Sequence, residues 1–197
     1  MDDQRGLLQR PGAPARGWRP EKGGCSAPVE ALAVDGEALG RSRGGLTSKV
    51  HLAVDGRGLP ISVLCTPGQA GDNPQLLPLL DAIRVPRRGP GRPRKRPEHV
   101  IADKAYSHPS TRRALRRLGI GHTIPEKRDQ QAHRRQRGSA GGRPPKFDQT
   151  RYKQRNVVER CFNRLKQFRA LATRYAKRAA YYRATLVLVS AVLWLRA

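Results

Sequence analysis

YKQRNVVERCFNRLK, residues 152–166, is the part of the sequence that is most informative about the fold of this chain. No Gly or Pro interrupts it, and apolar residues recur at helical spacing, so it is predicted to form one helix. Tyr152, Arg155, Glu159 and Lys166 are spaced so that they share roughly one face of that helix. Glu159 then has two interpretations. It is an ion-pair partner of Arg155 on a solvated face, or it is a metal-binding carboxylate whose cationic neighbours hold a phosphate chain.

The charge of the chain points to a polyanionic partner. Its 197 residues include 40 Lys and Arg against 15 Asp and Glu, a formal net charge of +25. Nucleic acid is the simplest partner, because Lys and Arg displace condensed counterions from phosphates. An anionic membrane surface is the competitor, but the charge is not arranged as one basic amphipathic helix. The apolar run 184–195 is too short to span a bilayer and is predicted to be a buried core helix.

The cysteines and the N-terminus indicate the reducing cytoplasm, where a nucleoid-associated location is expected. Cys25, Cys65 and Cys161 are scattered and form no Cys-x-x-Cys motif, which argues against a zinc site or a disulfide framework. The N-terminal residues lack the apolar segment of a signal peptide.

The order of predicted elements is that of an α/β domain. Residues 1–37 are expected to be disordered, and residues 38–197 to form the domain, with basic loops at 85–98 and 126–147. Asp55 belongs to the turn of a predicted hairpin. The predicted strands are 46–54, 60–65, 100–102 and 122–125. The predicted helices outside the first stretch are 73–84, a helix capped by Ser107 or Ser110 that ends at Leu118, and 179–195.

Asp103 directly follows the short apolar strand 100–102. Ligands of open α/β sheets collect beyond the carboxyl ends of strands, so Asp103 either binds a metal or begins a turn. Together with Glu159 it would supply two hard carboxylates, which suit Mg²⁺ or Mn²⁺. Such ions can stabilise both oxygens of an in-line phosphoryl displacement.

Three motifs resemble the DDE transposases of bacterial insertion sequences: residues 38–49 (ALGRSRGGLTSK), residues 102–106 (ADKAY) and the spacing Tyr152-x2-Arg155-x3-Glu159-x6-Lys166. The resemblance covers nearly everything from Ala38 to the C-terminus. It implies an RNase H-like fold, a mixed sheet flanked by helices, in which two Asp and one Glu bind two divalent metals. Such enzymes nick the element ends with water and join the freed 3′-hydroxyl to target DNA.

By this resemblance Asp103 is the second catalytic Asp and Glu159 the Glu, both metal ligands. Tyr152, Arg155 and Lys166 would lie along the transposon-end DNA. The expected partners are double-stranded DNA, as element ends and target, and further copies of the chain in a synaptic complex.

The first catalytic Asp of the family has no counterpart in this reading frame. The family pattern Trp-x-x-x-Val-Asp-Ser is absent, and Asp2 and Asp3 lie in no predicted strand. Translation of residues 1–23 one nucleotide out of frame permits a matching Trp, an Asp across codons 6 and 7, and Ala-His-Gln-His-Ala. The N-terminus is therefore interpreted as a frameshifted remnant. The first strand and first Asp are expected to be missing, and this copy to be inactive.

Weaker signals lie in the basic segments. Gly91-Arg92-Pro93-Arg94-Lys95 resembles an AT-hook core, in which Arg side chains enter the minor groove; nonspecific phosphate contact is the alternative for Arg92 and Arg94. Arginines at 112, 113, 116 and 117 are interpreted as one basic helix face, either a solvated surface or a DNA track. The competing function for the whole chain is a non-catalytic DNA-binding protein, such as a transposition inhibitor or a pseudogene product.

Overall fold

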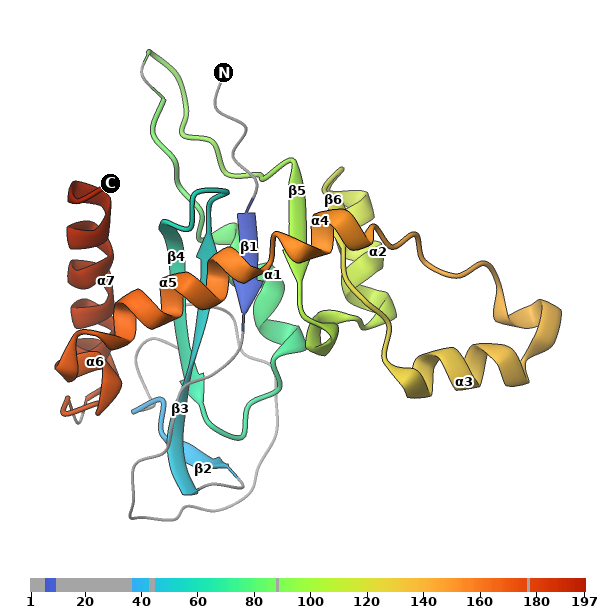
Figure 1. Ribbon diagram of the computed structural model, residues 1–197, viewed down its shortest axis with the longest axis horizontal. Helices are drawn as coiled ribbons and strands as arrows, with labels where there is room; N and C mark the ends of the chain where they lie inside the picture. The colour runs from blue at the N-terminus through green and yellow to red at the C-terminus, as the bar shows by residue number, and fades with distance from the viewer. Residues whose placement is uncertain (1–5, 10–36, 43–44, 88, 177) are drawn as a thin grey trace.

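The computed structural model describes residues 6–9, 37–42, 45–87, 89–176 and 178–197, and of residues 6–9 only the backbone. A mixed β-sheet forms the centre of the molecule (Figure 1). Its strands are β1 Gly6–Gln9, β2 Gly40–Ser42, β3 Gly45–Val54, β4 Pro60–Pro67, β5 His99–Ala102 and β6 Gly121–Thr123. From β4 the main order is β4-β3-β1-β5-β6, and β2 pairs with the start of β3.

The sheet combines an antiparallel hairpin with three parallel strands. β3 is antiparallel to both β4 and β1, whereas β1, β5 and β6 run in the same direction. Helices lie between the parallel strands in sequence, so the domain is α/β, as the order of predicted elements indicated.

The prediction that the sheet lacks its first strand is wrong. Gly6–Gln9 forms β1 in the middle of the sheet, with Leu8 beside Ala53 of β3 and Ala102 of β5. This strand lies inside the segment 1–37 that was expected to be disordered, and residues 1–5 and 10–36 lie outside the described part of the chain. The physical reason is that β3 and β5 would otherwise each present an unpaired edge. Backbone groups alone can satisfy such an edge, whatever the side chains are.

The predicted hairpin is confirmed, and so is the turn role of Asp55. Its Oδ1 accepts hydrogen bonds from the backbone N–H of Arg57 at 3.0 Å and of Leu59 at 2.8 Å. Asp55 is only 3% exposed, so its carboxylate is committed to the turn between β3 and β4. It is therefore not a substitute for the missing first Asp.

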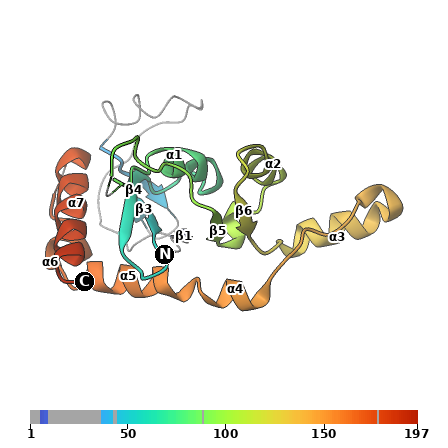
Figure 2. The same cartoon turned by 90° about the horizontal axis from the view of Figure 1, so that it is seen from above.

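Helices cover both faces of the sheet, and each face has its own apolar core. Figure 2 shows α1 (Leu76–Asp81) and α2 (Pro109–Arg117) on one side and α5 (Asn156–Lys166) on the other. Alternate residues of one strand enter different cores, since successive side chains of a strand point to opposite faces. Thus Ile101 packs with α5, whereas its neighbour Val100 packs with α1.

The first stretch is not one helix. It divides into α4 Gln149–Lys153 and α5 Asn156–Lys166, joined by a tight turn in which Arg155 N–H donates to the carbonyl of Tyr152 at 3.0 Å. Tyr152 therefore lies on a different helix from Glu159. The turn has no Gly or Pro to signal it, and both of its linking residues, Gln154 and Arg155, keep a helical backbone conformation.

The basic segment 126–147 is also not simply a loop. It contains α3 Arg128–Gln136, which projects from the body of the domain and has no buried residues (Figure 2). Its composition of Arg, Gln and Ala favours a helix, and this propensity was outweighed in the prediction by the absence of apolar periodicity. Between the other helices, α6 Arg169–Ala172 leads into α7.

The last helix, α7 Ala179–Leu195, has the predicted bounds but is not buried. One side packs on the sheet through residues such as Leu186 and Leu193, while Leu188 is 68% and Leu195 87% exposed. Trp194, expected in the core, is 39% exposed and donates its indole N–H to the Pro60 carbonyl at 2.6 Å. Within the described part of the chain, no helix has the length and apolar character needed to cross a membrane.

Two of the three cysteines lie in the described part of the chain. Cys65 and Cys161 are free thiols, and burial raises the pKa of each to about 11. Both thiols are therefore protonated at neutral pH, and Cys161 packs as an apolar core residue.

A buried polar network joins β3, β4 and the turn after β5. The His51 side chain is 1% exposed; its Nδ1 lies 3.2 Å from the Tyr106 hydroxyl and its Nε2 lies 2.9 Å from Thr66 Oγ1. Burial lowers the pKa of His51 to about 4, so the imidazole is neutral at neutral pH. Tyr106, also fully buried, thereby ties the turn containing Asp103 to the hairpin.

His51 makes folding stability depend on pH in a defined window. Its pKa is about 4 in the folded protein and 6.5 for an unperturbed histidine, so the unfolded chain binds the extra proton between these values. Stability from this group is complete above pH 6.5 and is lost as pH falls toward 4, by about 3 kcal/mol in total. Urea unfolding of the wild type and of His51→Gln at pH 7 and pH 5 measures it. The variant should lose less stability on acidification than the wild type.

His133 on α3 provides the matched control, because it is exposed. His133→Gln should keep the wild-type pH dependence. Equal pH dependence in His51→Gln and in the wild type would contradict the assignment.

Candidate metal and nucleic-acid site

Asp103 stands where β5 ends and the chain turns back. Its backbone is extended, and its Oδ1 accepts a hydrogen bond from Ala105 N–H at 2.9 Å, which caps the 3₁₀ turn Lys104–Tyr106. The turn interpretation of Asp103 is therefore confirmed. A carboxylate can cap with one oxygen and bind a cation with the other, so the metal role stays a prediction.

Glu159 lies in the first turn of α5 and forms the predicted ion pair. Its Oε1 is 2.6 Å from Arg155 Nη2, and the Glu159 side chain is 45% exposed. A pair this exposed stabilises the fold by less than about 1 kcal/mol. Because so little is lost when it breaks, the ion pair does not prevent the carboxylate from turning to a cation.

Tyr152 lies in the electrostatic field of both carboxylates. Burial raises the pKa of Tyr152, Arg155 acts in the opposite direction, and the negative charges of Asp103 and Glu159 raise the pKa further. Asp103 and Glu159 thus both act on the Tyr152 phenol, although they are distant in the sequence. Their joint role in one site stays a prediction.

Aromatic contacts hold Tyr152 in place. The guanidinium carbon of Arg155 lies 5.6 Å from the centre of the Tyr152 ring, and the Phe147 ring lies 5.3 Å away on a tilted plane. Arg155 therefore contacts both the phenol ring and the Glu159 carboxylate. Its charge stays close to the site whether or not the ion pair is made.

The chemistry of these donors fits a hard divalent cation, but their number is small. Asp103 and Glu159 offer carboxylate oxygens, the ligands that Mg²⁺ and Mn²⁺ prefer. Among the described residues, no cluster of three or more His, Cys, Asp or Glu side chains is placed to hold a metal ion. The described part of the chain therefore supplies two carboxylates where the sequence resemblance implies three.

Lys166 is the last residue of α5 and is exposed. It lies at the rim of a cavity of about 370 Å³ between β3, α5 and α7, whose lining includes Val50, Phe162 and Leu186. The cavity lining is mostly apolar, so the cavity is not itself a site for phosphate. Lys166 follows Glu159 by seven positions and so shares its helix face.

Arg92 and Arg94 are not part of this site. The segment 85–98 that carries them precedes β5, whereas Asp103 follows it, so they lie toward opposite ends of the strand (Figure 1). Arg94 pairs through its backbone with Val85 and through its guanidinium with Glu98 at 3.2 Å. Arg92 is exposed. The DNA-binding role of Arg92 and Arg94 stays a prediction, and it concerns a surface separate from Asp103.

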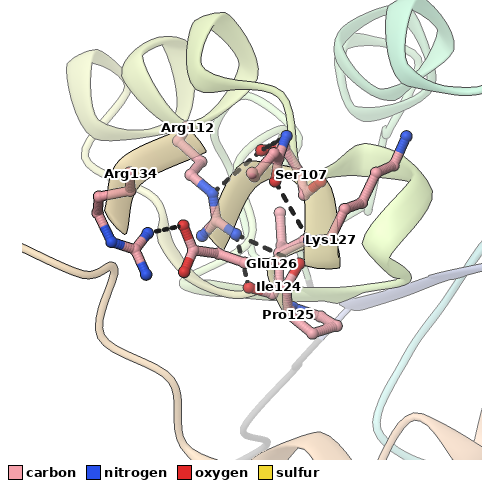
Figure 3. Close-up of polar contacts among 8 residues, drawn as sticks. Ser107, Arg112, Ile124, Pro125, Glu126, Lys127 and Arg134 are labelled. Atoms are coloured by element: carbon pink, nitrogen blue, oxygen red, sulfur yellow. Dashed lines mark hydrogen bonds and ion pairs between the residues drawn. The ribbon is translucent and has the colours of Figure 1, made fainter. Parts of the chain in front are cut away.

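The predicted basic face of α2 does not hold together in the structure, because one of its arginines is buried. This burial was not predicted from the sequence. Arg112 is buried at 5% exposure, whereas Arg113 and Arg116 are exposed. The signal was present in the sequence: Arg112 precedes Leu115 by three residues, which places it on the apolar side of the helix. Figure 3 shows its guanidinium turned toward the backbone of Ile124 and Pro125 rather than toward solvent.

Comparison with known proteins shows the family to which the chain belongs. The chain is 38% identical over 141 residues to a putative transposase for insertion sequence element IS402 from Burkholderia cepacia, covering 72% of this chain and 59% of that protein. It is 34% identical over 158 residues to a putative transposase for insertion sequence element IS6501 from Brucella ovis, covering 77% of this chain and all of that protein. The family model described as the transposase DDE domain matches residues 30–194, so the chain belongs to the DDE transposases of insertion sequences.

Proposed function

We propose that this chain is the catalytic portion of an insertion-sequence transposase that binds element-end DNA beside Tyr152. Asp103 and Glu159 are its catalytic carboxylates, and Tyr152, Arg155 and Lys166 contact the DNA. The observation that carries the proposal is that Arg155 contacts both the Tyr152 ring and the Glu159 carboxylate, and the electrostatic effect of Asp103 on the Tyr152 phenol supports it. Carboxylates need a cation between them and a phosphate, and the adjacent Arg155 suits the phosphate.

The sheet supports an RNase H-like fold for this domain. A hairpin, β3 and β4, lies on one side of the short central strand β1, and the parallel strands β5 and β6 lie on the other. Asp103 then lies at the carboxyl end of a parallel strand, the edge at which ligands collect in α/β sheets.

Divalent metal ions are generally used by this family, and Mg²⁺ or Mn²⁺ is the ion we propose. Bound between Asp103 and Glu159, such ions would polarise the phosphodiester and the attacking water or 3′-hydroxyl. Arg155 can leave Glu159 for a phosphate oxygen at little cost in stability. The neutral Tyr152 phenol can donate a hydrogen bond to the DNA backbone.

We further propose that this copy is catalytically impaired because it lacks the first carboxylate. β1 runs beside β5, with Gly6 opposite Val100 and Leu8 opposite Ala102, one residue before Asp103. The frameshift reading places its Asp across codons 6 and 7, at the start of this same strand. A carboxylate there would lie on the strand next to Asp103, which supports the interpretation of residues 1–23 as out of frame.

The test is Mg²⁺-dependent nicking and joining of a labelled element end by purified protein. This chain should give little or no product, whereas a chain with the shifted reading of residues 1–23 should be active because it regains the third carboxylate. Product is measured on denaturing gels against time. Robust cleavage by the unmodified chain would contradict the proposed impairment, and cleavage unaffected by Glu159→Gln in the active chain would contradict the catalytic assignment.

A non-catalytic DNA-binding protein is the second candidate, and the two-carboxylate site favours it for this copy. The net charge of +25 supports DNA binding without catalysis, and hence association with nucleoid DNA. Gel shifts on element ends separate the two candidates: binding with no nicking in either reading frame supports the binder, and nicking by the frame-restored chain supports the enzyme.

The exposed side of α7 supports self-association, as a synaptic complex requires. Tyr181, Leu188 and Leu195 recur at seven-residue spacing and are 62%, 68% and 87% exposed. Ala184 and Ala191 lie between them, which completes a coiled-coil pattern. No charged residue occurs from 184 to 195, although the chain carries +25 overall. A second copy is the occupant we propose, because this is a face on which two such cations can meet without repulsion.

Leu188→Glu should prevent this association, because it would place a charge in an apolar contact. Sedimentation equilibrium should show dimers of the wild type and at least a tenfold weaker association of the variant. Arg183→Glu, an exposed change on the other side of α7, is the control and should associate like the wild type. A wild type that remains monomeric at 100 μM, or a Leu188→Glu variant that dimerises normally, would contradict the proposal.

A further inference from the structure

A basic cleft lies between α2 and α3, separate from the carboxylates. Its volume is about 520 Å³. Arginines enter it from both helices and from the segment after α3: Arg112, Arg113, Arg116, Arg134, Arg137 and Arg143. One carboxylate, Glu126, is in the lining, so the cleft carries an excess of five positive charges. Close grouping of like charges is unfavourable unless an anion balances them.

The only acidic group in the described lining is already engaged. Glu126 forms an ion pair with Arg134, and both side chains are mostly buried (Figure 3). Arg113, Arg116, Arg137 and Arg143 are exposed, and none of them forms an ion pair with another described residue. Within the described part of the chain, these exposed arginines therefore lack an ion-pair partner.

Arg112 makes the floor of the cleft rigid and positively charged. Its Nε donates to the Ser107 carbonyl at 3.3 Å and its Nη2 to the Ile124 carbonyl at 2.7 Å, while its buried Nη1 has no hydrogen-bond partner in the described structure. Burial lowers the pKa of Arg112, and Glu126 opposes this. A guanidinium this buried with one nitrogen unsatisfied is costly, and an anion in the cleft would reduce that cost.

We propose that the α2–α3 cleft binds the phosphate backbone of double-stranded DNA at a second site, outside the carboxylate site. We commit to DNA rather than an acidic protein because six arginines line the cleft, guanidinium groups pair with phosphate oxygens bidentately, and DNA is the ligand of the proposed function. The proposal rests on the proposed function in that DNA is the ligand. It concerns binding alone and involves no step of catalysis.

The salt dependence of binding tests the proposal directly. The affinity constant K falls as salt rises, and removal of one arginine–phosphate pair makes the slope of log K against log salt less steep by about 0.9. The double variant Arg113→Gln/Arg116→Gln of the full chain should lower the slope by about 1.8 and weaken binding about 60-fold at 0.1 M salt. Fluorescence anisotropy of a labelled 30-base-pair duplex, from 50 to 200 mM salt, measures both. Circular dichroism establishes that each variant is folded.

Two further variants separate charge in the cleft from charge elsewhere. Arg113→Lys/Arg116→Lys keeps the charge and should keep most of the slope. Arg183→Gln/Arg196→Gln removes the same charge from the α7 end of the molecule and should leave the slope near that of the wild type (Figure 1). Equal loss of affinity in the α7 and cleft variants would overturn the proposal, since binding would then follow net charge alone.

Failure of cleft binding can be distinguished from failure of the proposed catalytic function. Glu159→Gln should abolish nicking in the frame-restored chain and leave the salt slope of cleft binding unchanged. Polyglutamate serves as a competing anion that stands in for an acidic protein. The proposal would be overturned if polyglutamate displaced the duplex while the Arg113→Gln/Arg116→Gln variant kept the wild-type salt dependence of duplex binding. The cleft would then be assigned to an acidic protein. A less steep salt dependence in the Arg113→Gln/Arg116→Gln variant, with no displacement of the duplex by polyglutamate, supports the proposal.

Discussion

The parallel pairing of β5 between β1 and β6 determines where Asp103 lies in this fold. Backbone hydrogen bonds on both sides fix the end of β5 at Ala102, so Asp103 emerges at a defined point of the sheet edge. The 3₁₀ turn then returns the chain through Tyr106, which the buried His51 holds from the hairpin side. Helix α5, which carries Glu159, packs on the same sheet through Val158, Cys161 and Leu165. If β5 shifted by one residue, Asp103 would point to the other face.

Positive charge is distributed over this framework in separate places. Arg155 serves the carboxylate site, Arg94 pairs with Glu98 on the segment before β5, and the arginines of the α2–α3 cleft have an excess of five charges. A chain at +25 would bind DNA nonspecifically through any of these. These arginines differ in their acidic partners: Arg155 and Arg94 would have to leave a carboxylate to reach a phosphate, whereas the exposed arginines of the cleft form no ion pair with a described residue.

Sequence reasoning found the parts of the site that depend on local patterns. The spacing of Arg155 and Glu159, the apolar strand before Asp103 and the turn at Asp55 each follow from short-range physics and were confirmed in their places. It failed where tertiary contacts decide. β1 forms because two strand edges need a partner, α4 separates from α5 without a Gly or Pro, and Arg112 is buried by contacts with a strand end that follows it by twelve residues. The metal role of Asp103 and Glu159 remains a proposal.

The most direct measurement of the central claim is local cleavage of the polypeptide by bound iron. Fe²⁺ in place of Mg²⁺, with ascorbate and peroxide, produces radicals that cut the backbone next to the ion, and mass spectrometry locates the cuts. If Asp103 and Glu159 hold one cation, cuts should occur both near residues 102–106 and near residues 155–160, and Asp103→Asn should remove both sets together. Cuts at only one of these segments, or cuts that persist in Asp103→Asn, would contradict the shared site.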